Sequence, residues 1–228
     1  MKKILSVLLT ALAFLTGCNK QDSYTYSGIE AGTLSSGIFT SDNGTRMKVE
    51  GNEGHYDVTT SRRVLISFET HPITDPSQIS IDILGLLDAG ILQPGHVDAL
   101  PEDPSGSPLE VTDAWFSGEY LNLLVTFEGK EAEKHTFATT YSVSGKGISF
   151  HLDHDGSQDA TAGDSPLSIF LSIPMYEPVL SYDQTAQATG VKPEYPVSVL
   201  LQWTARTLEG GPLTLLERKG SYQPPSGN

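Results

Sequence analysis

The residues with the clearest capacity for chemistry lie close together near the middle of the chain. They are His151, Asp153, His154, Asp155 and Asp159. Imidazole and carboxylate groups are common metal ligands, but an EF-hand loop needs its glycine at position six, and here Gly156 is at position four when Asp153 is counted as position one. The alternative is a strand that ends in an Asp155-Gly156 turn with solvated neighbours. We therefore predict no metal or cofactor, and treat His154, Asp155 and Asp159 as candidate binding residues.

Aromatic residues form a second candidate site. Trp115, Phe116, Tyr120 and Trp203 could stack against a ligand, or they could supply apolar area to the core. Alternation along residues 197–203 places Trp203 inside, whereas Trp115 and Tyr120 remain candidate binding residues.

Catalytic motifs are not recognisable. Serine, histidine and aspartate all occur, but no Gly-x-Ser-x-Gly turn, phosphate loop or dinucleotide fingerprint is present. We predict no catalytic residue and no enzyme, although a site assembled from distant loops would escape this test.

The N-terminus has the order of a bacterial export signal. Lys2 and Lys3 precede an apolar run from Ile4 to Leu15, which is shorter than the roughly 20 residues that span a bilayer. Leu15-Thr16-Gly17-Cys18 resembles the lipobox, in which the cysteine receives lipid and the preceding peptide is removed. Cys18 is the only cysteine, so we expect lipidation there and no disulfide. Asn19 at the next position favours the outer membrane, on either its periplasmic or its surface face.

The charge of the chain limits its partners. It carries 14 basic and 28 acidic residues, for a net charge of −14. Such a field repels phosphate backbones, so we predict no nucleic-acid partner. Solubility beside an anionic bilayer would account for the same charge.

The elements that must position these residues are strands. Apolar residues recur at every second position, the spacing that puts one row of side chains into a core, and helical spacing is nearly absent. The clearest rows begin at Val64, Ile79, Leu121, Ile148, Leu167 and Val197. With turn residues such as Asp42-Asn43-Gly44 between them, these rows predict an all-β fold with antiparallel sheets.

A proline-rich segment divides the chain. Residues 94–108 contain four prolines and two glycines and read as a linker. The other predicted parts are a signal peptide (1–17), a lipidated tether (18–27), a small OB-like β-barrel (28–93), an antiparallel β-sandwich (109–219) and a disordered tail (220–228).

Several segments resemble one family, the NigD-like lipoproteins. They are Gly32 to Val49 (GTLSSGIFTSDNGTRMKV), Arg63 to Phe68 (RVLISF), Asp113 to Leu123 (DAWFSGEYLNL), Lys134-His135-Thr136-Phe137, and Phe150 to Asp159 (FHLDHDGSQD), where Asp155 replaces an asparagine of the family. The resemblance implies an OB-like domain followed by a β-sandwich and gives no reaction. The gene neighbourhood behind the family name suggests bacteriocin immunity.

These observations favour a non-catalytic lipoprotein of the cell envelope that binds a protein or glycan partner, with immunity as one version. The alternatives are a hydrolase of envelope or dietary polymers, which would use the 151–159 cluster, and a structural scaffold of an outer-membrane assembly.

Overall fold

The computed structural model describes residues 23–159, 165–206 and 211–225. Its elements, in chain order, are β1 (Ser27–Ser35), β2 (Ile38–Ser41), β3 (Arg46–Asn52), β4 (Arg62–Thr70), β5 (Ile79–Ile91), β6 (Gly95–His96), β7 (Glu110–Ser117), β8 (Tyr120–Glu128), the 3-10 helix η1 (Ala132–Lys134), β9 (Thr136–Ser144), β10 (Gly147–Asp155), β11 (Pro166–Pro174), α1 (Tyr176–Ala188), β12 (Val197–Arg206) and β13 (Leu213–Tyr222). The predicted all-β class is confirmed. Among the described helices, none is long and apolar enough to cross a membrane.

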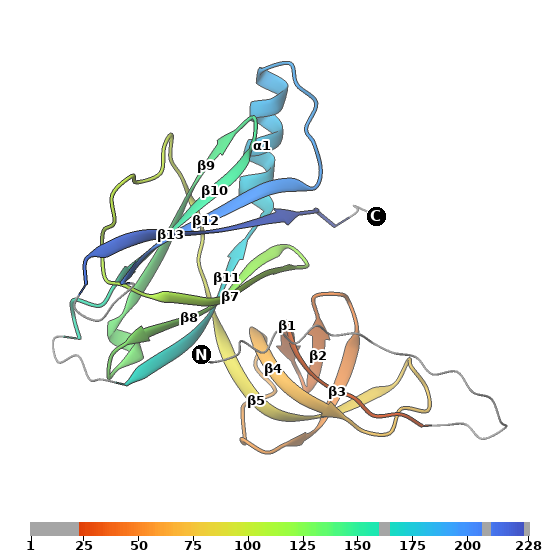
Figure 1. Ribbon diagram of the computed structural model, residues 1–228. Coiled ribbons are helices and arrows are strands. Elements are labelled where there is room, and N and C mark those ends of the chain that lie inside the picture. Colours follow the sequence, from red (N-terminus) through yellow and green to blue (C-terminus); the bar gives the residue numbers. More distant parts are fainter. Residues whose placement is uncertain (1–22, 160–164, 207–210, 226–228) are drawn as a thin grey trace, which may run out of the picture.

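The first five strands form the smaller body of the molecule (Figure 1). Their order is β3-β2-β1-β4-β5, and an additional pairing of β3 with β5 closes them into a ring. The row Val64, Ile66 and Phe68 points inward from β4, and all three side chains are fully buried. Alternation along one strand therefore fills the interior of the ring, as the sequence predicts.

Two sheets form the larger body. One continues the first sheet through β5-β11-β8-β7, and the other has the order β13-β12-β10-β9-β6. Their inner faces share one apolar core, to which β8, β10 and β12 contribute Leu123, Phe150 and Trp203 among others. Trp203 is 5% exposed, so its predicted place in the core is confirmed.

The sheets are mixed, which corrects the expectation of antiparallel pairing throughout. Strands β10 and β12 run parallel, as do β11 and β5. Parallel neighbours need a crossover connection, and between β10 and β12 the chain passes through β11 in the other sheet and then α1. Helix α1 buries Pro178, Tyr182 and Ala186, one residue per turn along one side. This helix was not predicted from the sequence.

The boundaries predicted for the C-terminal tail and the N-terminal tether also differ from the structure. Strand β13 continues to Tyr222, whose ring is 3% exposed, so residues 220–222 belong to the sheet and not to a disordered tail. Within this extension, a Cβ on Gly220 would lie 3.2 Å from the Phe116 ring, so the glycine lets that ring pack closely on β13. At the other end, Tyr26 exchanges hydrogen bonds with Thr70, so this part of the predicted tether is fixed to the ring.

The segment predicted as a linker, residues 94–108, is hereafter called the proline-rich segment. It begins with β6, which pairs with β9, and then passes over the outer face of the five-stranded sheet. Val97 donates its N–H to the Tyr141 carbonyl at 2.8 Å, and Ser105 donates its N–H to the Thr204 hydroxyl at 3.1 Å. The proline-rich segment therefore covers part of a sheet as well as connecting the two bodies.

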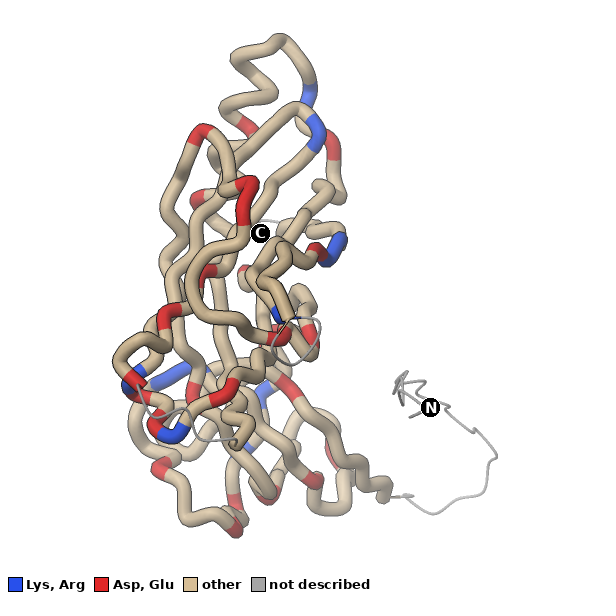
Figure 2. The backbone as a smooth tube through the Cα atoms, turned by 60° about the vertical axis from the view of Figure 1, so that its left-hand side comes forward, with Lys and Arg blue, Asp and Glu red and all other residues tan. Residues whose placement is uncertain are grey.

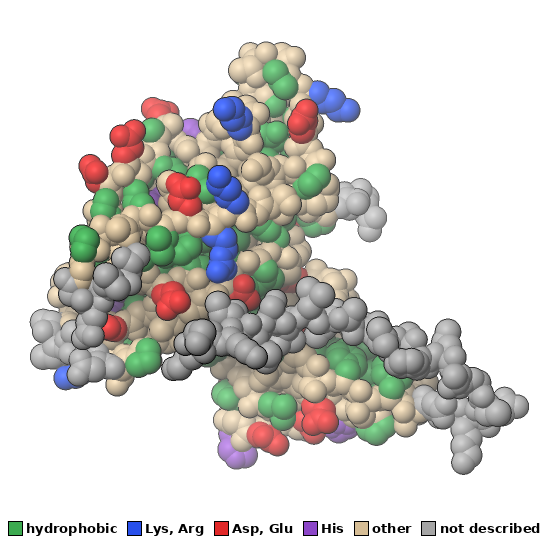
Figure 3. All heavy atoms as spheres, viewed as in Figure 1, with side chains coloured by type: hydrophobic (Ala, Val, Ile, Leu, Met, Phe, Trp, Pro, Cys, Tyr) green, Lys and Arg blue, Asp and Glu red, His purple; other side chains and the backbone are tan. Residues whose placement is uncertain are grey.

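Acidic residues are spread along the chain in both bodies and outnumber the basic ones (Figure 2). On the face shown in Figure 3, the visible basic side chains lie on the larger body. Acidic residues therefore predominate in both bodies.

Candidate functional site

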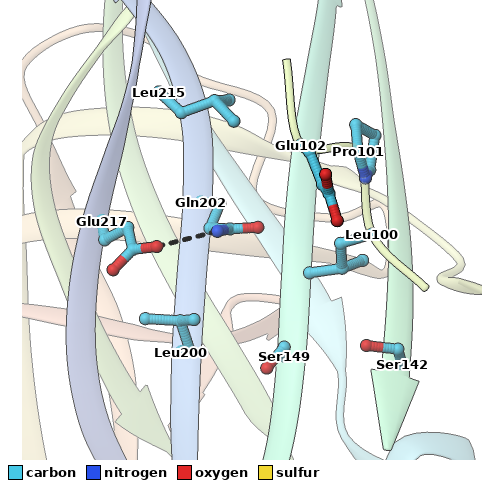
Figure 4. Close-up of a pocket in the computed structure, with 9 residues that line it drawn as sticks. All are labelled: Leu100, Pro101, Glu102, Ser142, Ser149, Leu200, Gln202, Leu215 and Glu217. Carbon is cyan, nitrogen blue, oxygen red and sulfur yellow. Dashed lines mark hydrogen bonds between the residues drawn. The ribbon is translucent and has the colours of Figure 1, made fainter. Parts of the chain in front are cut away.

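A pocket of about 480 Å³ lies between the proline-rich segment and the outer face of the five-stranded sheet. We call it the sheet pocket (Figure 4). Its volume falls within the range usual for ligand sites, roughly 300–1,000 Å³. The lining residues are Leu100, Pro101, Glu102, Ser142, Ser149, Leu200, Gln202, Leu215 and Glu217.

Strand alternation places the floor of the sheet pocket. On β12, Leu201 and Trp203 point into the core, so Leu200 and Gln202 between them point to the outer face. Gln202 lies opposite Glu217 in the register of β12 with β13, and Ser149 of β10 lies opposite Leu200. The same alternation that builds the core therefore also builds the pocket floor.

The polar groups of the floor are only partly paired. Gln202 donates its Nε2 to Glu217 Oε1 at 2.8 Å, and its Oε1 is buried without a hydrogen-bond partner among the described residues. Figure 4 shows Glu102 and Glu217 on opposite sides of Gln202. The Gln202 carbonyl oxygen is therefore an unsatisfied acceptor within the part of the chain that the structure describes.

None of these nine residues was a candidate in the sequence analysis. They come from the proline-rich segment and four strands, and only the cover of residues 100–102 turns the sheet surface into a pocket. The one sequence signal for the pocket was the presence of polar residues between the apolar ones on strands β9, β10 and β12. Every strand with a solvent-facing side shows the same pattern, so this signal does not identify a pocket.

Two of the predicted site residues, His154 and Asp159, meet at a third residue, His135. His135 Nδ1 lies 2.9 Å from His154 Nε2, and His135 Nε2 lies 3.2 Å from Asp159 Oδ2. We call these three residues the histidine cluster. His135 lies in the Lys134-His135-Thr136-Phe137 segment of the family resemblance, but the sequence analysis gave it no role.

The histidine cluster is enclosed. His135, His154 and Asp159 are 8%, 4% and 6% exposed, and the ring of Phe127 packs against both imidazoles. A Cβ added to Gly129 or Gly156 would lie within 3 Å of the His135 ring. The hydrogen bonds of the cluster hold the segments around residues 130 and 159 against β10.

The charges of the histidine cluster are set by burial and by backbone donors. Burial, and then the neighbouring His135, lowers the pKa of His154. The backbone N–H of Lys130, together with those of Glu131 and the His135 ring, lowers the pKa of Asp159 to about 2, against the effect of desolvation. At neutral pH the cluster therefore holds a charged carboxylate and an uncharged His154.

The remaining predicted residues lie elsewhere. Asp155 is exposed and accepts a hydrogen bond from the Ser157 N–H at 2.9 Å, as expected of the proposed turn. His151 lies three positions before His154 and so on the other face of β10, where it is fully buried and contacts Asp153 Oδ1 at 3.1 Å. The cluster seen in the sequence is thus divided between two faces of one sheet. No group of three potential ligands that could hold a metal ion occurs in residues 23–159, 165–206 and 211–225.

Trp115 and Tyr120 lie where the two bodies join. The Trp115 ring stacks on Phe170 with centroids 5.9 Å apart, and the guanidinium carbon of Arg63 lies 3.8 Å from the centroid of the Tyr120 ring. Both aromatic rings are thus engaged by the chain itself, away from the histidine cluster.

Arg63 is the centre of this junction. It binds Asp42 through both terminal nitrogens at 2.7 Å each, and it also donates to Asn122 and Ser172 at 2.8 Å. The Arg63 and Asp42 side chains are 7% and 10% exposed. Because Arg63 and Asp42 belong to the ring and the other two residues to the larger body, this network fixes one body to the other.

The histidine cluster gives a testable pH dependence. Because the pKa of His154 is lowered in the folded state, the unfolded chain binds a proton first as the pH falls, and folding stability should decline below about pH 6.5. Asp159 acts at lower pH: its stabilisation is present above about pH 4 and is lost as the pH falls toward about 2.

We expect His154→Asn to reduce the loss of stability between pH 7.5 and pH 5. Urea unfolding at both pH values measures it, and His96→Asn, at an exposed histidine, is the matched control. An unchanged pH dependence in His154→Asn would show that this imidazole does not titrate as described.

A closed ring of five strands, joined through a shared strand to a two-sheet body, defines the chain as an all-β protein of two connected bodies. This fold is also that of a NigD-like immunity protein from Bacteroides caccae, with a TM-score of 0.59, 19% identity, and coverage of 88% of this chain and 97% of that one. A candidate lipoprotein from Bacteroides fragilis matches with a TM-score of 0.59 at 16% identity over 88% of this chain and 99% of its own. A protein of unknown function from Bacteroides vulgatus matches with a TM-score of 0.56 at 12% identity, covering 89% and 93%.

No protein-family profile matches the chain, and no curated protein sequence matches it. At the identities found, the likeness to the solved structures is one of fold. The resemblance to NigD-like proteins noted in the sequence is confirmed at that level.

Proposed function

We propose that the chain is a non-catalytic lipoprotein of the cell envelope that binds a protein or glycan partner through the sheet pocket. The observation that carries the proposal is a pocket of ligand size whose floor holds a buried acceptor without a described partner. The enclosure of His154 and Asp159 also favours binding over hydrolysis, because these residues were the main support for a hydrolase.

The membrane anchor is part of the proposal. Cys18 lies outside the described residues, and the lipobox-like Leu15-Thr16-Gly17-Cys18 supports lipidation there, with Asn19 favouring the outer membrane. The fold shared with a candidate lipoprotein is consistent with this. Two or more acyl chains on one residue would hold the body at the membrane durably.

Replacement of Cys18 by alanine should therefore move the protein from the outer-membrane fraction to the soluble fraction. Cell fractionation and the mass of the N-terminal peptide measure this, with Asn19→Ser as the control. An unacylated N-terminus in the native protein would contradict the anchor.

The binding role is tested by a photo-cross-linking residue placed at Leu215, on the wall of the sheet pocket, in cells that make the full chain. We expect one dominant adduct at this position and none at Glu177, an exposed residue on α1. Absence of any adduct at Leu215, together with turnover of an envelope polymer by the purified chain, would overturn the proposal in favour of the hydrolase.

Immunity is one version of the binding role, and the fold shared with a protein called a NigD-like immunity protein supports it. It predicts that cells lacking the gene become sensitive to a toxin encoded beside it. A scaffold of an outer-membrane assembly would instead give a Leu215 adduct with a permanent membrane-protein neighbour.

A further inference from the structure

We infer that the sheet pocket binds a basic side chain, arginine or lysine, of a polypeptide partner. The inference rests on the proposed function and assigns the chemistry of its ligand.

The charge of the lining favours a cation. Glu102 and Glu217 are its charged residues, and none of the nine lining residues is lysine or arginine. Within the described chain, neither carboxylate belongs to an ion pair with a lysine or arginine. Lys219 pairs in register with Leu200 on β12 but does not line the pocket. The two carboxylates are therefore available to a cation.

The donors and acceptors of the pocket also favour a cation. A carboxylate only accepts hydrogen bonds, so Glu217 takes the amide N–H of Gln202, and the Gln202 carbonyl oxygen has no hydrogen-bond partner among the described residues. Figure 4 shows this oxygen pointing away from Glu217, toward the side on which Leu100 and Glu102 lie. Ammonium and guanidinium groups have donors and no acceptor, which matches a pocket whose lining holds two carboxylates and no basic side chain.

The apolar part of the lining suits the stem of a basic side chain. Leu100, Pro101, Leu200 and Leu215 surround the polar groups. Lysine and arginine have long methylene stems that pack on apolar surface while the charged end makes polar contacts. The lining contains no aromatic ring, and so offers no stacking surface of the kind that would favour a sugar.

The charge of the whole chain acts in the same direction. Its net charge of −14 would attract a basic partner at long range and raise the rate of encounter.

The test measures binding of Nα-acetylarginine amide to the full chain in detergent micelles by NMR. Its neutral isostere, Nα-acetylcitrulline amide, is the matched ligand control. We expect the arginine probe to shift the Gln202 side-chain amide signals and to bind at least about tenfold more tightly than the citrulline probe, as charge-assisted hydrogen bonds would give. Added salt should weaken the arginine probe alone.

The variant Glu102→Gln/Glu217→Gln should lose at least about tenfold in affinity for the arginine probe. Glu177→Gln, which removes an equal charge from exposed α1, should lose little. Equal binding of both probes, or unchanged affinity in the double variant, would overturn the inference. Saturation of the pocket by N,N′-diacetylchitobiose would point to a glycan and would overturn it as well. If the inference fails while Leu215 still forms its adduct, the proposed binding function stands with another ligand.

Discussion

Replacement of Arg63 by alanine is expected to lower the free energy of unfolding by about 3–5 kcal/mol, the cost typical of removing one partner of a buried ion pair. The change would leave the Asp42 carboxylate, 10% exposed, without its two bonds from the guanidinium. It would also leave Asn122 and Ser172, both fully buried, without a donor from the ring.

The adjacent Arg62 provides a matched control. It pairs with Asp88 and Asp57, whose side chains are 66% and 50% exposed, so Arg62→Ala should cost no more than about 1 kcal/mol. Denaturant unfolding compares the two variants. A loss in Arg63→Ala no larger than that in Arg62→Ala would show that the network does not stabilise the junction. The double variant Arg63→Ala/Asp42→Ala should be more stable than the sum of the single changes implies.

The second large effect is expected at Gly32 of β1. A Cβ at this position would lie 2.3 Å from the Thr40 carbonyl oxygen and 2.8 Å from the Ser41 Cα, both in the backbone of β2. Because backbone atoms cannot turn aside as a side chain can, Gly32→Ala should force the β1–β2 pair apart and destabilise the protein by about 3 kcal/mol.

Gly95→Ala is the control for this prediction, because a Cβ on Gly95 meets nothing within 4 Å. Thermal unfolding should show a lower melting temperature for Gly32→Ala and little change for Gly95→Ala. Equal stability of both variants would contradict the crowding at Gly32. The prediction also gives a physical reason for the glycine that opens the Gly32–Val49 segment of the family resemblance.

The strands were predictable where one face of the strand is buried in a core and apolar residues therefore alternate with polar ones. Rows such as Val64-Ile66-Phe68 and Val197-Val199-Leu201-Trp203 enter a core with one face only, so period two appears directly in the sequence. Helix α1 was not predicted because its buried residues include few large apolar side chains. These residues are Pro178, Tyr182 and Ala186. The clearest local signal of α1 is Gly190, which ends the helix at φ +71° while its N–H bonds to the Gln187 carbonyl.

The candidate site was less predictable than the fold. The 151–159 segment looked like one cluster because its residues are neighbours in sequence, yet strand alternation places His151 and His154 on opposite faces of β10. The residue that contacts the His154 ring is His135, which lies 19 residues earlier, between η1 and β9. The sheet pocket depends on the path of residues 94–108, and composition alone reveals their prolines but not what they cover.

Strand β5 is shared by both bodies, and this sets an order of assembly. Its N-terminal part pairs with β3 and β4 of the ring, whereas Ala89–Ile91 pairs with Phe170–Ser172 of β11. All strands of the ring lie within residues 27–91, so the ring can close as soon as this part of the chain has emerged. Until β11 follows, Ala89–Ile91 is an open strand edge, the kind of surface on which newly made chains aggregate. Chaperones that bind exposed strand edges would be needed most during that interval.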